Sequence, residues 1–245
     1  MPTLLFKDVG LVKGKRFGSD RRVGAAMQAI RVYNRRGVDE LVFADVSATP
    51  MGRPPDFAQI DLLADECFMP LTVAGGVRNA DDIGRLLSVG ADKVAVNSAA
   101  IRDPHLIKEG ARRYGVQCIV ASIDVRREDN NWRVYTHCGT RPTDLDPFRW
   151  AQTAAQMGAG EILLTSIDQD GTMEGYDIPL IKGVTEAVSI PVVASGGAGS
   201  YADMAAALRE GKASAVAAAS IFHYTEMTPR EAKLYLKNQG FAVRV

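Results

Sequence analysis

Short runs of apolar, β-prone residues alternate along the chain with longer stretches in which apolar residues recur at helical spacing. Several short runs are apolar throughout, as in parallel strands that are covered on both faces. The predicted strands are residues 3–6, 40–45, 71–74, 93–97, 118–124, 161–166, 191–195 and 213–219. Helices are expected near residues 22–36, 57–67, 80–89, 104–114, 147–157, 178–188, 201–209 and 229–239. Eight strands in strict alternation with eight helices predict an α/β fold, namely a (β/α)8 TIM barrel.

The second half of the chain repeats the first. Residues 69–101 resemble residues 190–222, so that Pro70 matches Pro191 and Gly75–Gly76 matches Gly196–Gly197, each pair 121 residues apart. A period of half the chain is too long for a solenoid repeat. No Pro- or Ser-rich linker interrupts it. We therefore expect one domain over residues 1–245, a barrel with two-fold pseudo-symmetry between its halves.

Composition excludes several classes of protein. The 245 residues carry 29 basic and 29 acidic side chains, without the basic excess of a nucleic-acid or membrane-surface binder. No apolar run reaches the roughly 18 residues of a membrane span, and no secretory signal is visible, so a cytoplasmic protein is expected. Cys67, Cys118 and Cys138 lack metal-site spacing and are predicted to be buried free thiols. With no cluster of His, Cys and carboxylates, no metal site is expected.

Two pairs of glycines lie where phosphate binding is expected. In a barrel the working residues lie at the carboxyl ends of the strands. Gly75–Gly76 and Gly196–Gly197 end the third strand of each half, and 97–99 and 218–220 end the fourth. Glycines there let backbone N–H groups approach an anion, and a following helix N-terminus favours one. Tight turns alone would explain one such pair. The symmetric repetition favours two phosphate sites and a ligand with a phosphate at each end.

Carboxylates at the same strand ends are candidates for proton transfer. Asp124 ends the longest apolar run and is the strongest catalytic candidate. Asp45 ends another predicted strand. Asp168 is read as a turn former, whereas turn formation and catalysis compete evenly for Asp170. His105 is expected to be solvated at a helix start, and His137 and His223 are placed in loops near the fifth and eighth strands.

The motifs DELVF, GADKV, GAGEILLTS-D-DGT-GYD and ASGGAG occur in this order. Over essentially its full length the chain resembles the cyclase-subunit family of imidazole glycerol phosphate synthase. The resemblance implies a barrel that receives ammonia from a glutaminase docked at its amino-terminal face. The ammonia would react with a bisphosphate ribonucleotide to give imidazole glycerol phosphate and an aminoimidazole carboxamide ribotide, without a cofactor.

The resemblance also assigns roles by position. Asp124 corresponds to the general acid, and Lys13 to a lysine of the first loop. Glu40, Lys93 and Glu161 correspond to a charged ring that gates ammonia entry. Such a buried ring is costly unless its charges are paired. The residues expected to bind the substrate or its phosphates are Lys13, Asp45, Gly76, Asn97, Ser98, Thr165, Asp170, Gly171, Gly196, Gly197, Ala218 and Ser220.

The chain departs from the family pattern in three ways. Leu5 stands where the family has a second catalytic Asp, so Asp8 is considered as a substitute base. A fourth gate member, a basic residue early in the first strand, has no counterpart. The segments PTLLFKDVGLVKG and DECFMPL resemble a paralogous branch associated with surface polysaccharides. That branch is thought to supply ammonia to a separate ligase that amidinates a nucleotide-linked sugar. We expect this conduit role, with the histidine-pathway cyclase as the alternative.

Overall fold

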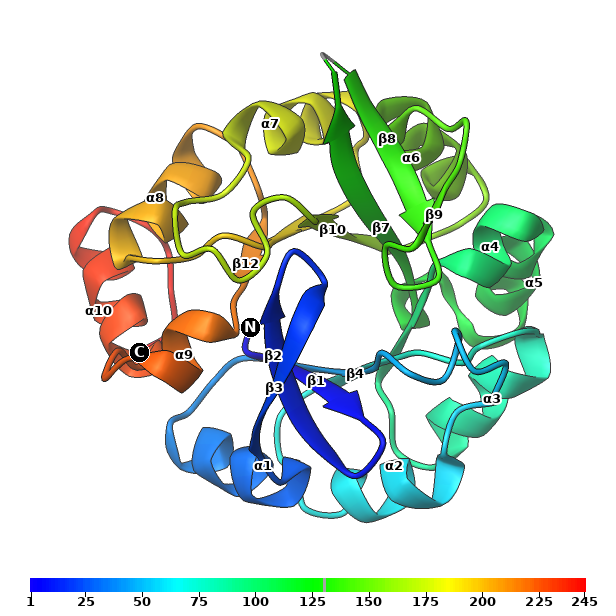
Figure 1. Cartoon of the computed structure of the whole chain (residues 1–245), viewed down its shortest axis with the longest axis horizontal. Helices are drawn as coiled ribbons and strands as arrows, with labels where there is room; N and C mark the ends of the chain where they lie inside the picture. Colours follow the sequence, from blue (N-terminus) through cyan, green and yellow to red (C-terminus); the bar gives the residue numbers. More distant parts are fainter. Residues whose placement is uncertain (130) are drawn as a thin grey trace.

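The computed structural model describes residues 1–129 and 131–245, apart from the side chains of Ser19 and Asp20. In this part of the chain, eight parallel strands lie side by side and curl into a barrel (Figure 1). Pro2 and Ala218 form a parallel bridge that joins the first strand to the last, and the Thr3 N–H donates to Ala218 O at 2.9 Å. The predicted barrel is confirmed. Its strands are β1 (Thr3–Lys7), β4 (Leu41–Asp45), β5 (Leu71–Ala74), β6 (Lys93–Val96), β7 (Ile119–Glu128), β10 (Glu161–Ser166), β11 (Val192–Ser195) and β12 (Ala215–Ala217).

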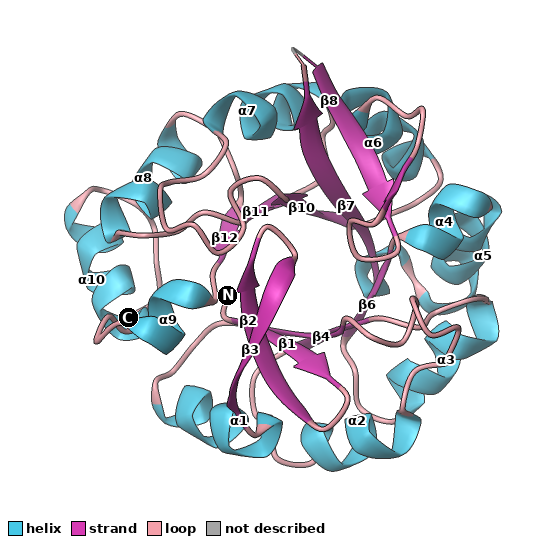
Figure 2. Ribbon diagram, in the orientation of Figure 1, coloured by secondary structure: helices cyan, strands magenta, loops and turns pink. Residues whose placement is uncertain are grey.

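Helices surround the barrel on its outside (Figure 2). Several begin at side-chain caps, as when Asp146 accepts from the Arg149 N–H or Ser200 forms a capping box with Asp203. The eight helices that follow the predicted pattern are α1 (Ala26–Arg35), α2 (Phe57–Ala64), α3 (Ala80–Ser88), α5 (His105–Tyr114), α6 (Pro147–Gln156), α7 (Ile178–Ala187), α8 (Tyr201–Arg209) and α10 (Pro229–Asn238).

Two antiparallel additions rise from the carboxyl-terminal end of the barrel, and neither was predicted. The first is a hairpin of β2 (Gly10–Lys15) and β3 (Gly18–Gly24), so the helix expected from residue 22 begins only at Ala26. In the second, β7 extends beyond Asp124 and pairs with β8 (Asn131–Thr136), which pairs with β9 (Arg141–Pro142). Figure 2 shows the first hairpin in front of the barrel opening and the second at its edge.

A five-residue helix follows the fourth strand in each half of the barrel. These helices are α4 (Ser98–Arg102) after β6 and α9 (Ser220–Tyr224) after β12. Their matching positions agree with the two-fold pseudo-symmetry.

His223 lies in α9 and not in a loop as expected, whereas His105 is exposed at the start of α5 as predicted.

The apolar core has two parts because successive residues of a strand point to opposite faces. In β4, Leu41 and Phe43 belong to the large cluster that includes helix residues, whereas Val42 belongs to a small cluster from six strands. Its other buried members are Ala95, Val120, Leu163, Val193 and Ala217. This inner layer separates a cavity at the carboxyl ends of the strands from charged side chains at their amino ends.

The three cysteines are free, as predicted, but each is only partly buried. No helix in the described residues is long and apolar enough to span a membrane.

Candidate functional site

A cavity of about 490 Å³ opens at the carboxyl ends of the barrel strands, and all eight strands contribute to its walls. The structure brings together here every residue that was predicted to bind the substrate, together with Asp124. Those that line the cavity are Lys13, Asp45, Gly76, Asn97, Ser98, Asp124, Thr165, Asp170, Gly171, Gly196, Gly197, Ala218 and Ser220. The cavity is therefore the candidate active site.

Asp124 lies in the cavity wall on β7. Asn97, at the end of the neighbouring β6, donates from Nδ2 to Asp124 Oδ2 at 3.0 Å. Burial, with a further contribution from the charge of Asp170, raises the pKa of Asp124 to about 7. A carboxyl group with such a pKa exists in both protonation states near neutral pH. It can donate or accept a proton there.

Lys13 and Asp170 form a buried ion pair above the same cavity. The Lys13 side chain is 3 % exposed, and its Nζ lies 3.2 Å from Asp170 Oδ1. A backbone hydrogen bond also holds the hairpin, because the Arg16 N–H donates to Asp170 O at 2.8 Å. The loop after β10 therefore secures the hairpin that carries Lys13.

Asp168 lies in the turn after β10, and its hydrogen bonds are to distant segments. Its Oδ2 accepts from the Arg127 N–H at 2.7 Å, and its carbonyl accepts from Arg16 Nε at 3.2 Å. Asp45 also lines the cavity, but its Oδ1 accepts from the N–H and hydroxyl of Ser47. One oxygen of Asp45 is therefore engaged by its own loop.

The glycine turns leave no room for side chains. At Gly76, φ is +75° and a Cβ would lie 2.8 Å from Pro54 C. At Gly197, φ is +112° and a Cβ would lie 2.0 Å from Gly175 O. The bare backbone at both turns lets a ligand approach the main chain closely.

Hydroxyl groups accompany both turns. Ser98 Oγ accepts from the His137 N–H at 3.0 Å. The buried Ser220 Oγ has no hydrogen-bond partner in the described part of the chain. Most buried polar atoms are paired, so this hydroxyl is available to a ligand.

The first barrel strand contributes Leu5 to the cavity wall. On β1, Leu5 lines the cavity together with Thr3 and Lys7, so β1 places an apolar side chain there. Asp8 does not line the cavity. It lies exposed in the turn between β1 and β2, with φ of +58°. The structure does not bring Asp8 together with Asp124.

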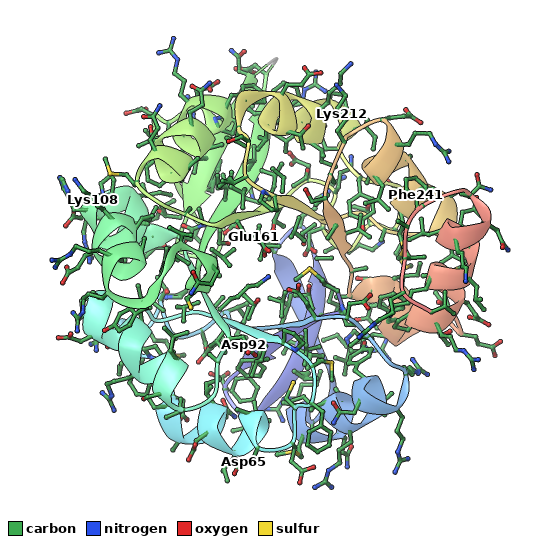
Figure 3. The ribbon with its side chains drawn as sticks, turned by 180° about the vertical axis from the view of Figure 1, so that it is seen from behind. Asp65, Asp92, Lys108, Glu161, Lys212 and Phe241 are labelled. Carbon is green, nitrogen blue, oxygen red and sulfur yellow. The ribbon has the colours of Figure 1, made fainter. Side chains whose placement is uncertain are left out.

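Three charged residues meet at the opposite end of the barrel. Lys93 Nζ lies 2.8 Å from Glu40 Oε2 and 2.8 Å from Glu161 Oε2. Burial lowers the pKa of Lys93, but hydrogen bonds and charges from Glu161 and Glu40 outweigh it, so the pKa is raised overall. Figure 3, seen from behind, places Glu161 near the middle of this face. The predicted ring is thus a compact, mutually paired cluster.

Sequence reasoning missed several residues of the cavity. Ser122 lies two positions before Asp124, so strand alternation would have placed it on the same wall. Cys138 and Thr140 come from the loop between β8 and β9, which was not predicted. Their position depends on pairing between β7 and β8, for which the charged sequence gave little signal.

Comparison with known proteins agrees with this geometry. The family model described as "Histidine biosynthesis protein" matches residues 2–228. The chain belongs to this family. It is also 50 % identical over 245 residues to imidazole glycerol phosphate synthase subunit HisF of Dehalococcoides mccartyi strain BAV1. The subunit of the same name from strain CBDB1 is equally similar. Both alignments cover 100 % of this chain and 97 % of the relative. These histidine biosynthesis relatives favour the cyclase alternative over the polysaccharide-associated role expected from the sequence.

Proposed function

We propose that the chain is the cyclase subunit of an imidazole glycerol phosphate synthase, a lyase of histidine biosynthesis that acts on a bisphosphate ribonucleotide with ammonia. The observation that carries this proposal is the cavity in which Asp124 lies between two glycine-hydroxyl turns. In that role Asp124 is the general acid, and its raised pKa leaves a substantial protonated fraction at neutral pH.

The rest of the cavity would bind the two ends of the substrate. Gly197, Ala218 and Ser220 surround one phosphate, together with Asp170 and Gly171. Gly76, Asn97 and Ser98 surround the other. Lys13 lies over the substrate from the hairpin. These groups are all on the cavity wall, and no cofactor is required in this proposal.

Ammonia would enter from the amino-terminal face of the barrel. A glutaminase subunit docks there in this proposal, and the cluster of Glu40, Lys93 and Glu161 gates the entrance. The cluster supports a gate because three charges lie together at the start of the strands, where a purely structural core would use apolar residues.

A cytoplasmic location for the protein also stays a prediction.

The side chain of Leu5 favours a second candidate. A leucine cannot transfer a proton, and the loss of one member of an acid–base pair costs about 10²–10⁴-fold in rate. The chain would then serve as an ammonia conduit for a partner that amidinates a nucleotide-linked sugar. The apolar wall contributed by Leu5 is what supports this candidate.

A cyclase assay separates the two candidates. The bisphosphate ribonucleotide and an ammonium salt are supplied to the chain and to its Leu5→Asp variant, and the two products are measured. Turnover of the unmodified chain near 1 s⁻¹, within the ordinary range of enzymes, would support the cyclase. An inactive chain whose Leu5→Asp variant is active would support the conduit instead. Asp124→Asn in each background is the negative control.

A further inference from the structure

Two arginines and a histidine lie next to the loop that carries Cys138 and Thr140 to the cavity wall, outside the residues assigned above. His137, in the loop after β8, is joined to Arg141 of β9 by a 3.2 Å contact between Nε2 and Nη1. Arg102, at the end of α4, is close enough to act on His137 electrostatically. Neither arginine forms an ion pair with a carboxylate of the described side chains. We call Arg102, His137 and Arg141 the cationic rim.

The rim is tied directly to one of the glycine-hydroxyl turns. The His137 N–H donates to Ser98 Oγ at 3.0 Å, and Ser98 lines the cavity. Cys138 and Thr140, from the same loop as His137, also line it. The rim therefore stands beside the turn formed by Gly76, Asn97 and Ser98, and not at the far turn of Gly197 and Ser220.

The loop that carries His137 is held in an unfavourable backbone conformation. His137, Cys138 and Gly139 have consecutive φ values of +51°, +54° and +74°. For the two non-glycine residues this conformation costs roughly 1–2 kcal/mol each, and such strain tends to occur at ligand sites. In addition, burial and the charges of Arg141 and Arg102 lower the pKa of His137. An anion placed here would pair with Arg102 and Arg141, two cations that have no carboxylate partner among the described side chains.

The contacts of His137 indicate the protonation state of its ring before any anion binds. Arg141 can only donate, so its contact with Nε2 of His137 is a hydrogen bond when Nε2 accepts, that is, when the ring is neutral. Its proton is then on Nδ1, which lies 3.1 Å from Thr136 Oγ1. If Arg141 turned to an anion, Nε2 would be released and could take up a proton. The imidazolium would then add a second positive partner for the anion.

We propose that the cationic rim is an anion site that captures a phosphate monoester end beside Ser98. This inference rests on the proposed function only in assigning a phosphate to that turn. It adds three side chains to the ligand's surroundings. It also predicts that capture couples to proton uptake by His137.

The test uses proton NMR of the three histidine rings, His105, His137 and His223, in the whole chain. The resonances are assigned with single His→Gln variants and titrated with pH, with and without inorganic phosphate. A phosphate dianion among the rim side chains is expected to raise the pKa of His137 by about half a pH unit or more. His105, exposed at the start of α5, serves as the internal control.

Variants make the assignment specific. Arg141→Gln is expected to raise the pKa of His137 in the free chain and to remove most of the phosphate effect. Arg112→Gln, which changes an exposed arginine of α5, should do neither. A phosphate effect on His223 alone would place the anion at the far turn and overturn the proposal. So would a His137 titration unchanged by phosphate, or a phosphate effect that persists in Arg141→Gln.

The readout does not depend on turnover. If the chain proves to be a conduit without cyclase activity, the His137 titration still decides whether the rim binds a phosphate. A sugar phosphate in a second titration distinguishes a substrate-like end from the free ion. A larger effect than that of inorganic phosphate indicates that the rim and the cavity act together.

Discussion

The chemistry of single residues here depends on neighbours that are distant in the sequence. The place of Asp124 in the cavity could be predicted from the apolar run before it, but the continuation of β7 beyond it to Glu128 could not. Its raised pKa could not, because the main causes are burial and Asp170, which belongs to a loop 46 residues away. The contact of Lys13 with Asp170 spans 157 residues. Such contacts form because the closed barrel brings distant segments together, and the local pattern of apolar and polar residues does not reveal them.

Replacing Asp124 should reveal the cost of ionising it. Its pKa is raised from 3.8 to about 7, so the folded chain holds this proton more tightly than the unfolded chain. The resulting stabilisation of the protonated form is lost as pH rises from about 4 to about 7. Asp124→Asn should therefore come close to the unmodified chain in stability near pH 3.5, below the unfolded pKa, and exceed it near pH 8. Urea unfolding at both values measures the difference, and pH-independent curves would contradict it.

Asp124→Asn should also abolish most activity. If Asp124 is the general acid, the amide keeps the size of the side chain but supplies no transferable proton, and kcat should fall about 10²–10⁴-fold. In the unmodified chain, kcat/KM should decline as pH rises through about 7, where free Asp124 loses its proton. A pH profile that is flat between pH 6 and 8 would exclude this role.

Whole elements were predictable where they alternate regularly. The barrel strands and outer helices follow apolar periodicity, and a segment such as 71–74 agrees with β5 at both ends. The hairpin of β2 and β3 gave no such signal. Its turn places Arg16 and Phe17 at φ of +53° and +60°, where Asn and Gly are preferred. Contacts with the loop after β10 stabilise a turn that these residues do not favour by themselves.

A single substitution should displace this hairpin from the loop after β10. A Cβ at Gly171, where φ is +73°, would lie 2.0 Å from Gly14 O. Gly171→Ala should therefore push the hairpin away and speed amide hydrogen exchange in residues 10–24, while exchange in the barrel strands changes little. Gly18→Ala is the matched control, because a Cβ there meets only Lys15 O at 3.6 Å. Unchanged exchange in Gly171→Ala would show that the hairpin does not depend on this close approach.

On the scale of the whole molecule, the two ends of the barrel carry different groups. One end gathers the cavity, and the other holds Lys93 between Glu40 and Glu161. The ends are separated by the inner apolar layer. This division was predictable because strand starts and strand ends can be located from the repeat.

Removing the central cation should destabilise the fold at neutral pH. In Lys93→Met, Glu40 and Glu161 lose the ammonium that both contact at 2.8 Å and repel one another. The three side chains are partly exposed. We therefore expect the free energy of unfolding to fall by only about 1–2 kcal/mol and Tm by about 2–8 °C. Lys93→Met combined with Glu161→Gln should recover part of this loss. Equal melting of the single and double variants would contradict mutual pairing.

The two-fold repeat poses a problem of orientation for the ligand. Two similar turns, at Gly75–Gly76 and Gly196–Gly197, face one cavity, and a molecule with a phosphate at each end could enter such a mouth in either of two directions. Only features that lack a counterpart in the other half can tell the ends apart. Asp124 opposite the apolar Leu5, and a hairpin anchored through Lys13 to Asp170, break the equivalence. If the chain binds the bisphosphate proposed above, the repeat would supply a phosphate site at each end, and the differences between the halves would fix the direction in which the ligand lies.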